Sequence, residues 1–455
     1  MVDIDIGYFG DERLRKGGEL LIQRIAERQA VCLRQLGDDR AEQVKFRRFL
    51  LNDSVTVQEM VSHQAMLVAK VATGRHVLAI QDTSEINYEA QRGRKRRLGT
   101  VGNGTDVGLF VHPVLVVDAG SKECLGLVGA QVWRRRKRKA ANYKSLPIER
   151  KESCRWLKGG EQAKAALTAA AMVTILDDRE GDIYEKWARL PDRRTHLLTR
   201  ASQNRSLADG DSLFPTLAGF PEVHRYMLDL PARPGKRSAR QACIAVRFGR
   251  VRIRRPRSCS DPNAPDEIEL FAIEARELNA PPGEEPVHWR LLTTHTVETV
   301  AQAMQVIGWY RLRWNIEQLF RTLKRQGLGI EQSVIEDGAA LEKLAMLALI
   351  GACITMQLVL ARQADNPEAP AERVFDDLQI EVLHALQSKL QGATTKQKNP
   401  YQPGTLRWAS WTITRLGGWT GYASDRSTGP ITMRDGLQRF YGMVAGYELR
   451  SHQRL

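Results

Sequence analysis

HVLAIQDTSEINY, residues 76–88, begins as an apolar run and ends in polar residues. A short continuous run of Val, Leu, Ala and Ile predicts a buried strand. Two further apolar runs follow it closely, LFVHPVLVVD at 109–118 and CLGLVGAQVW at 124–133. Three successive strands with short connections predict the antiparallel start of a sheet.

The pattern changes after these strands to an alternation of helix and strand. Residues 153–170 and 183–190 have helical spacing of apolar residues, whereas MVTILDD at 172–178 and THLLTRA at 195–201 are strand-like. Three strands, a helix, a strand, a helix and a strand is the order of a ribonuclease-H-like fold, antiparallel first and then parallel through crossovers. We therefore predict an α/β protein built on a ribonuclease-H-like core.

Segments on both sides of this core have different compositions. Residues 202–290 are rich in Pro and Gly, and IAVRFGRVRIRR and EIELFAIEAREL alternate with period two, which predicts a β-rich insertion. Residues 1–70 have helical spacing with Arg on the polar face, which fits either a domain that grips DNA or an ordinary solvated face. We place the catalytic domain at residues 71–370 and, from the linker-like DNPEAPAE onward, a mainly helical C-terminal domain at 371–455.

The balance of charge predicts a polyanionic partner. The chain has 455 residues, with 68 Lys plus Arg against 53 Asp plus Glu and a formal net charge of +15. Nucleic acid is the usual partner of so basic a protein, although a soluble enzyme that is merely basic fits the same count. The basic runs at 92–97 and 134–139 and the loop TTKQKNPYQPG fit either interpretation.

Three features predict a cytoplasmic protein without a membrane span. The six cysteines are scattered without metal-ligand spacing. The N-terminal MVDIDIGYFGDER is acidic and lacks the apolar segment of a signal peptide. Residues 344–361 are uncharged and about long enough to cross a bilayer, but they contain Thr355 and Gln357, so we expect a buried core helix there.

Two acidic residues follow predicted strands of one sheet. Asp82 comes after VLAI and Asp178 closes MVTILDD, so we expect the two carboxylates to meet. Like charges at short range repel, and a divalent cation removes that cost. Oxygen ligands with open positions suit Mg²⁺ or Mn²⁺, and two such ions activate a nucleophile and stabilise a leaving 3′ oxygen. A turn or cap role is the alternative for an Asp at a strand end.

A third acid lies on a predicted helix, in WYRLRWNIEQLFRTLKRQG. The offsets of three, four and seven residues place four side chains near one helix face, those of Tyr310, Arg313, Glu317 and Lys324. An acid beside two cations and an aromatic ring suits a phosphate held next to a metal ion. A surface helix stabilised by ion pairs is the alternative.

The spacing Y-x2-R-x3-E-x6-K resembles the signature of the DDE transposases of the IS-four family. AIQDTSEINY resembles that family's first-aspartate strand, and LDDREGDI resembles its second-aspartate motif. The resemblance implies that Asp82, Asp178 and Glu317 are catalytic and hold two Mg²⁺ or Mn²⁺ ions. The adjacent Asp177 leaves an ambiguity of one residue at the second position.

The same resemblance implies DNA contacts by Arg200, Trp289, Tyr310, Arg313 and Lys324. Trp289 is expected to stack where a base is flipped out of the duplex, and the others are expected to bind phosphates. Tyr184 stands where a relative has a histidine, and the N-terminal 70 residues are only loosely similar.

The resemblance also implies a reaction, cut-and-paste transposition. Such an enzyme binds the terminal inverted repeats of its element as a homodimer on double-stranded DNA, nicks each end, forms and reopens a hairpin, and joins the 3′ ends to target DNA. Subunit contact is assigned to residues 371–455, where Trp408 and Trp411 belong either to the interface or to the core. A nuclease without strand transfer and a DNA-binding protein derived from an inactive transposase are the alternatives. The presence of all three carboxylates counts against the second.

Overall fold

The computed structural model describes residues 5–135, 143, 146–233, 235, 237–366, 368–422 and 428–452. Its helices are α1 (Glu12–Arg28), α2 (Leu33–Leu36), α3 (Arg40–Leu51), α4 (Val57–Ala72), α5 (Cys154–Ala166), α6 (Tyr184–Arg189), α7 (Leu213–Gly219), α8 (Val300–Leu312), α9 (Trp314–Leu323), α10 (Gly338–Ala361), α11 (Asp377–Leu390), α12 (Leu406–Leu416) and α13 (Pro430–His452). Its strands are β1 (His76–Gln81), β2 (Ser84–Asn87), β3 (Gly99–Val101), β4 (Asp106–Asp118), β5 (Cys124–Trp133), β6 (Met172–Asp177), β7 (Thr195–Arg200), β8 (His224–Leu230), β9 (Arg240–Arg254), β10 (Glu267–Leu278) and β11 (His288–Thr293).

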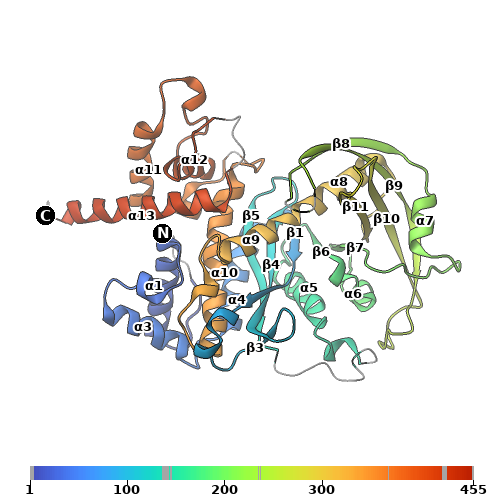
Figure 1. The fold of residues 1–455 in the computed structure, drawn as a ribbon, viewed down its shortest axis with the longest axis horizontal. Helices are drawn as coiled ribbons and strands as arrows, with labels where there is room; N and C mark the ends of the chain where they lie inside the picture. Colours follow the sequence, from blue (N-terminus) through green and yellow to red (C-terminus); the bar gives the residue numbers. More distant parts are fainter. Residues whose placement is uncertain are drawn as a thin grey trace.

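A large mixed sheet organises the molecule (Figure 1). Strands β5, β4 and β1 pair antiparallel. Strands β6 and β7 then pair in parallel with β1 and with each other, and the connections contain α5 and α6. The predicted α/β class is confirmed, and so is the predicted order of antiparallel strands followed by parallel strands with helical crossovers.

The stretch at 76–88 forms a strand that is interrupted at its change from apolar to polar residues. β1 and β2 pair with the same edge of β4 in one continuous register. Asp82 and Thr83 lie between them, opposite Pro113 and His112, and have no place in the ladder. Pro113 has no N–H to donate to a neighbouring strand. The interruption leaves Asp82 outside the regular sheet.

The β-rich segment extends the same sheet. β11 pairs antiparallel with β7, and β10, β9 and β8 follow in that order. β11 continues to Thr293, beyond the expected end of the segment near residue 290. These strands lie on the opposite side of the core from the C-terminal helices (Figure 1).

Helix α10 contacts both the N-terminal and the C-terminal helices as well as the sheet. It packs against α1, α3 and α4 near the N-terminus, against β5 of the sheet, and against α9, α12 and α13. The helix is long and apolar enough to cross a membrane, but 89% of its apolar stretch is buried inside the protein. The prediction of a core helix is therefore confirmed. Gly351 lets α1 approach closely, because an added Cβ would lie 2.8 Å from Cγ2 of Ile25.

The C-terminal helices enclose an apolar cluster of their own. Trp408 and Trp411 of α12 are 0% and 1% exposed, and Phe375 and Phe440 pack edge to face in the same region. Of the two interpretations of these tryptophans, the structure supports a core role.

Candidate active site

The first predicted carboxylate, Asp82, lies in the interruption between β1 and β2. One of its oxygens accepts a hydrogen bond from the backbone N–H of Thr83 at 2.7 Å. Burial and the nearby carboxylate of Asp178 raise the pKa of Asp82 to about 7, while Arg313 opposes the rise. Asp82 and Asp178 therefore share one electrostatic environment, as expected for acids at neighbouring strand ends.

The neighbours Asp177 and Asp178 lie on opposite faces of the end of β6. Asp177 is fully buried, forms an ion pair with the buried Lys186 of α6, and accepts a hydrogen bond from the hydroxyl of Thr199 at 2.9 Å. Asp178 caps the short 3-10 helix η4 (Arg179–Gly181) by accepting from the N–H of Glu180. Because adjacent strand residues point to opposite faces, only one of the two acids can face Asp82. This arrangement favours Asp178 for the site and gives Asp177 a structural role.

The third carboxylate, Glu317, lies in the first turn of α9. The sequence predicted one continuous helix through this region, and that prediction is wrong. α8 ends and α9 begins at Arg313, where the hydrogen bonds tighten to a spacing of three residues. Lys324 lies just past the end of α9, in an extended conformation. The tight turn that follows requires glycine at position 327, because a Cβ there would lie 1.8 Å from the carbonyl oxygen of Thr322.

Arg313 joins two of the predicted acids. Its guanidinium donates to Asp82 at 3.0 Å and to Glu317 at 2.5 Å. The guanidinium therefore bridges the two acids through one charge-assisted hydrogen bond to each, a stronger contact than a bond between neutral groups. The break between α8 and α9 places Arg313 between the sheet and Glu317, so carboxylates from β1 and α9 converge on one cation.

The predicted DNA contacts Arg200, Trp289 and Tyr310 form a group beside these acids. Arg200 at the end of β7 donates to the backbone carbonyl of His288 at 2.8 Å. The rings of Trp289 and Tyr310 meet edge to face, with centroids 5.8 Å apart. Tyr310 is buried, whereas Trp289 and Arg200 are partly exposed. Trp289 is therefore the ring of this pair that is accessible to a ligand.

A cleft of about 410 Å³ continues from Glu317 to Lys324. Arg321 and Arg325 also line it, and sequence analysis did not single them out. Arg321 lies over one side of the ring system of Trp314 at 5.2 Å, and Arg233 of the β-rich segment lies over it at 5.3 Å. The spacing of Glu317 and Arg321 by four residues was the available signal, because such residues share a helix face.

Several described residues of the basic runs make contacts within the protein. Lys95 donates to the carbonyls of Ser333 and Ile335, and burial lowers its pKa to about 8. Arg97 pairs with Asp337, and a second set of ion pairs joins Arg134 to Glu342 and Arg135 to Glu152. Residues 136–139 of the second run lie outside the described residues.

The donor set fits a divalent cation, although the acids are not gathered around one point. Among the described residues, no group of three His, Cys, Asp or Glu side chains is close enough to hold a metal ion as it stands. Arg313 lies between Asp82 and Glu317, where it supplies positive charge to two acids. The raised pKa of Asp82 reflects the burial and repulsion that a bound cation would relieve. Hard oxygen donors of this kind are the ligands that Mg²⁺ and Mn²⁺ prefer.

Comparison with known proteins gives a match to a family model and a likeness to a solved structure. Residues 157–354 match the family model described as the transposase DDE domain. That span contains Asp178 and Glu317, and Asp82 precedes it. Among solved structures, the chain is similar to the piggyBac transposase synaptic complex with hairpin DNA, at 10% identity and a TM-score of 0.39, over 97% of this chain and 72% of that chain. A likeness this distant is no basis for assigning function.

Proposed function

We propose that this chain is a DDE transposase that moves a DNA element by cut-and-paste transposition, and the match of residues 157–354 to the transposase DDE domain supports the proposal. In this proposal the enzyme binds the terminal inverted repeats, nicks each end, forms and reopens a hairpin, and joins the freed 3′ ends to target DNA. The observation that carries the proposal is the convergence of Asp82 and Glu317 on Arg313 with Asp178 in the same field. We place the chain in the IS-four group, near the transposase of transposon Tn-five, and assign the five-stranded part of the sheet to the ribonuclease-H-like fold.

We assign the metal to Asp82, Asp178 and Glu317. DDE transposases in general use divalent metal ions, and we propose two Mg²⁺ or Mn²⁺ ions per site. When bound, such ions lower the pKa of a water nucleophile and stabilise the leaving 3′ oxygen. The chain's own contribution is to hold three carboxylates on rigid elements, a strand end, a capped 3-10 turn and a helix.

Arg313 has a second role in this proposal. Its bonds to Asp82 and Glu317 neutralise those acids while no cation is held there. With Asp82 and Glu317 bound to metal ions, the guanidinium of Arg313 would be free to bind a phosphate oxygen, which its planar fork of donors suits. Arg200 and Lys324 add positive charge on either side. These groups orient the scissile phosphate for in-line displacement.

Hairpin formation requires a sharp reversal of the DNA strand, and we assign the relief of that strain to Trp289. Flipping one base out of the stack costs a few kcal/mol. An aromatic ring that stacks in the place of the flipped base stabilises the opened duplex by about 1–3 kcal/mol. Trp289 is partly exposed, and its ring packs edge to face against the buried ring of Tyr310. This arrangement suits a side chain that must remain firm while a base pair opens.

We propose that the active species is a homodimer on DNA in a reducing cytoplasm. Paired cleavage of two ends requires two active sites, and the six cysteines form no disulfide. The helices at residues 1–70 would bind the DNA ends, and residues 371–455 would contribute to subunit contact. Because Trp408 and Trp411 are core residues, contact between subunits must use other side chains of that segment.

The test is a cleavage and strand-transfer assay on a duplex that carries the DNA flanking the gene, with Mg²⁺ or Mn²⁺. We expect Asp82→Asn and Glu317→Gln to abolish nicking and strand transfer while duplex binding persists. The matched control is Glu298→Gln, because Glu298 is an exposed acid of the same type outside the site. Cleavage without any joining to target DNA would replace the proposal with a nuclease. Binding without cleavage by the unaltered chain would replace it with a DNA-binding protein.

A further inference from the structure

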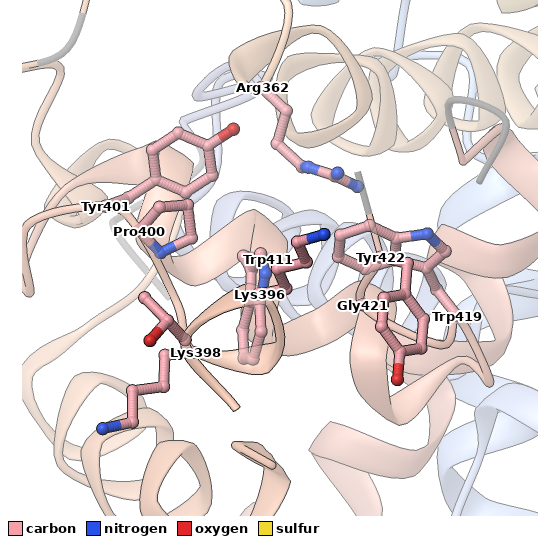
Figure 2. Close-up of a pocket in the computed structure, with 10 residues that line it drawn as sticks. Arg362, Lys396, Lys398, Pro400, Tyr401, Trp411, Trp419, Gly421 and Tyr422 are labelled. Atoms are coloured by element: carbon pink, nitrogen blue, oxygen red, sulfur yellow. The ribbon is translucent and has the colours of Figure 1, made fainter. Parts of the chain in front are cut away.

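A pocket of about 460 Å³ lies in the C-terminal part of the chain, between the end of α10 and α12 (Figure 2). Its walls come from three segments, Arg362, the loop 395–401 that contains the 3-10 helix η7 (Thr395–Gln397), and residues 411–422. The volume falls in the range of small-ligand sites. No residue of the catalytic group lines it.

The pocket combines cations with aromatic rings. Among the described residues that line it, the charged ones are Arg362, Lys396 and Lys398, and none is acidic. Four rings share the same walls, those of Tyr401, Trp411, Trp419 and Tyr422. Cations without acids select an anion, and flat rings select a planar group, because a ring face offers a stacking surface.

Among the residues that the structure describes, no acid forms an ion pair with Arg362. Its guanidinium lies 4.0 Å from the centre of the Trp419 ring and donates to the hydroxyl of Thr428 at 2.8 Å. Its Nε has no hydrogen-bond partner in the described chain, and burial lowers the pKa of the group. A partly buried cation without an acid is costly, and an anionic ligand would remove that cost.

The rings differ in their accessibility. Trp411 is almost fully buried and forms the floor, whereas Tyr422 is 39% exposed. The hydroxyl of Tyr422 accepts a hydrogen bond from Gln397 at 3.1 Å, which links it to the basic loop. In Figure 2, Arg362 points toward Trp419, and Lys398 points outward from the group. Arg362 and Lys396 are therefore the cations best placed for a ligand, and Tyr422 is the accessible ring.

We propose that this pocket binds one unpaired nucleotide of DNA, with the base stacked on Tyr422 and Trp419 and its phosphate between Arg362 and Lys396. The chemistry requires a ring and an anion in one ligand, which a nucleotide supplies. The choice of DNA as its source rests on the proposed function. Because Arg362 ends α10 while Glu317 lies on α9 in a separate cleft, the pocket is a second DNA contact, distinct from the site of cleavage.

The experiment measures binding of a fluorescein-labelled single-stranded dT10 to the full chain by anisotropy, in EDTA, at several salt concentrations. Tyr422→Ala should weaken binding roughly five- to a hundred-fold, the effect of losing one stacked base. Lys396→Ala should lower the slope of log K against log salt by about 0.7. Tyr422→Phe keeps the ring and should bind nearly as the parent does. Lys389→Ala, which removes an exposed cation of α11 outside the pocket, should leave binding nearly unchanged.

A decamer with the same phosphates but no bases separates stacking from charge. Tyr422→Ala should leave its binding unchanged, whereas Lys396→Ala should weaken it as it does dT10. Equal loss for both probes with Tyr422→Ala would overturn the stacking role. A different result would assign the pocket to an acidic protein segment. In that case Lys396→Ala would lose the binding of a decaglutamate peptide that the parent shows, and Tyr422→Ala would not affect dT10 binding.

Two further results distinguish this proposal from the proposed function. Arg200→Ala should add to the effect of Tyr422→Ala, because distant independent sites are additive. If Tyr422→Ala leaves dT10 binding unchanged while the parent still cleaves DNA, the pocket assignment alone falls. If the pocket variants behave as expected while no DNA is cleaved with metal present, the proposed function alone falls.

Discussion

Arg313 at the candidate active site and Arg362 at the C-terminal pocket are both partly buried beside aromatic rings, but their charges are handled differently. Arg313 bonds to Asp82 and Glu317, so its charge is balanced within the protein. Arg362 lies against Trp419, and its hydrogen-bond partner Thr428 is neutral. The same side chain thus serves as an internal counterion in one region and as a receptor for an anion in the other. Arg313 must give up its carboxylate partners before it can bind a phosphate, whereas Arg362 needs only to gain an anionic ligand.

The largest expected effect concerns the two acids at the end of β6. Asp178→Asn should reduce DNA cleavage by about a thousand-fold or more, since a metal ligand supplies several kcal/mol to the transition state. Asp177→Asn should instead lower the free energy of unfolding by about 3–5 kcal/mol, because it leaves Lys186 buried without its partner. Nicking rates and urea unfolding of both variants measure the contrast. Loss of cleavage in Asp177→Asn at unchanged stability would reverse the assignment.

The next effect concerns Trp289, the accessible ring of the active site. Trp289→Ala should reduce hairpin formation roughly five- to a hundred-fold, because the ring no longer replaces the flipped base. First-strand nicking should change little, since that step does not require strand reversal. Trp289→Phe should recover most of the hairpin yield. A gel assay that resolves nicked and hairpin products follows both steps, and equal loss of both would contradict the stacking role.

A smaller effect tests the counterion role of Arg313. Arg313→Ala should raise the affinity of the DNA-free protein for Mn²⁺ by about tenfold, because a competing positive charge leaves the carboxylates. The same variant should cleave DNA more slowly. Arg362→Ala is the matched control and should not change Mn²⁺ affinity. Titration calorimetry measures the metal affinity, and weaker Mn²⁺ binding by Arg313→Ala would show that Arg313 organises the acids instead of competing for them.

The smallest effect extends the comparison to the basic runs. Arg97 is mostly exposed and already paired with Asp337. Arg97→Ala should therefore change the free energy of unfolding by less than about 1 kcal/mol. It should also change the salt slope of duplex binding by much less than the 0.9 or so of a true phosphate contact. A full change of that size would show that the Asp337 pair opens on DNA.

The order of the central strands could be predicted, and the three acids could be selected as candidates, because both leave local signals. Apolar runs with short connections identify strands, and the break at Asp82 coincides with the change from apolar to polar residues. Glu317 was found through its spacing from Arg313. A pattern within a few residues determines each of these features, so tertiary packing was not needed to find them.

The remaining features depend on contacts between distant segments. The helix break at Arg313 and the end of α9 before Lys324 could not be read from apolar spacing, which continues across both positions. Asp177 and Asp178 were distinguished only by the buried Lys186 that lies on one face of β6. The C-terminal pocket joins residues near 362, 396 and 420, and no periodicity connects those positions.

The packing of α1 and α3 on α10 has a consequence for the order in which the chain is made. About 310 residues separate the end of α1 from the start of α10. At 5–20 residues per second, a ribosome needs roughly 15–60 s to bridge that interval. During that time the faces of α1 and α3 that pack on α10 have no permanent partner. The contact of Gln438 in α13 with the carbonyl of Arg28 forms later still. The packing of α1 and α3 is therefore complete only when α10 and α13 have been made, and a chain that ends before α10 leaves these two helices without that packing.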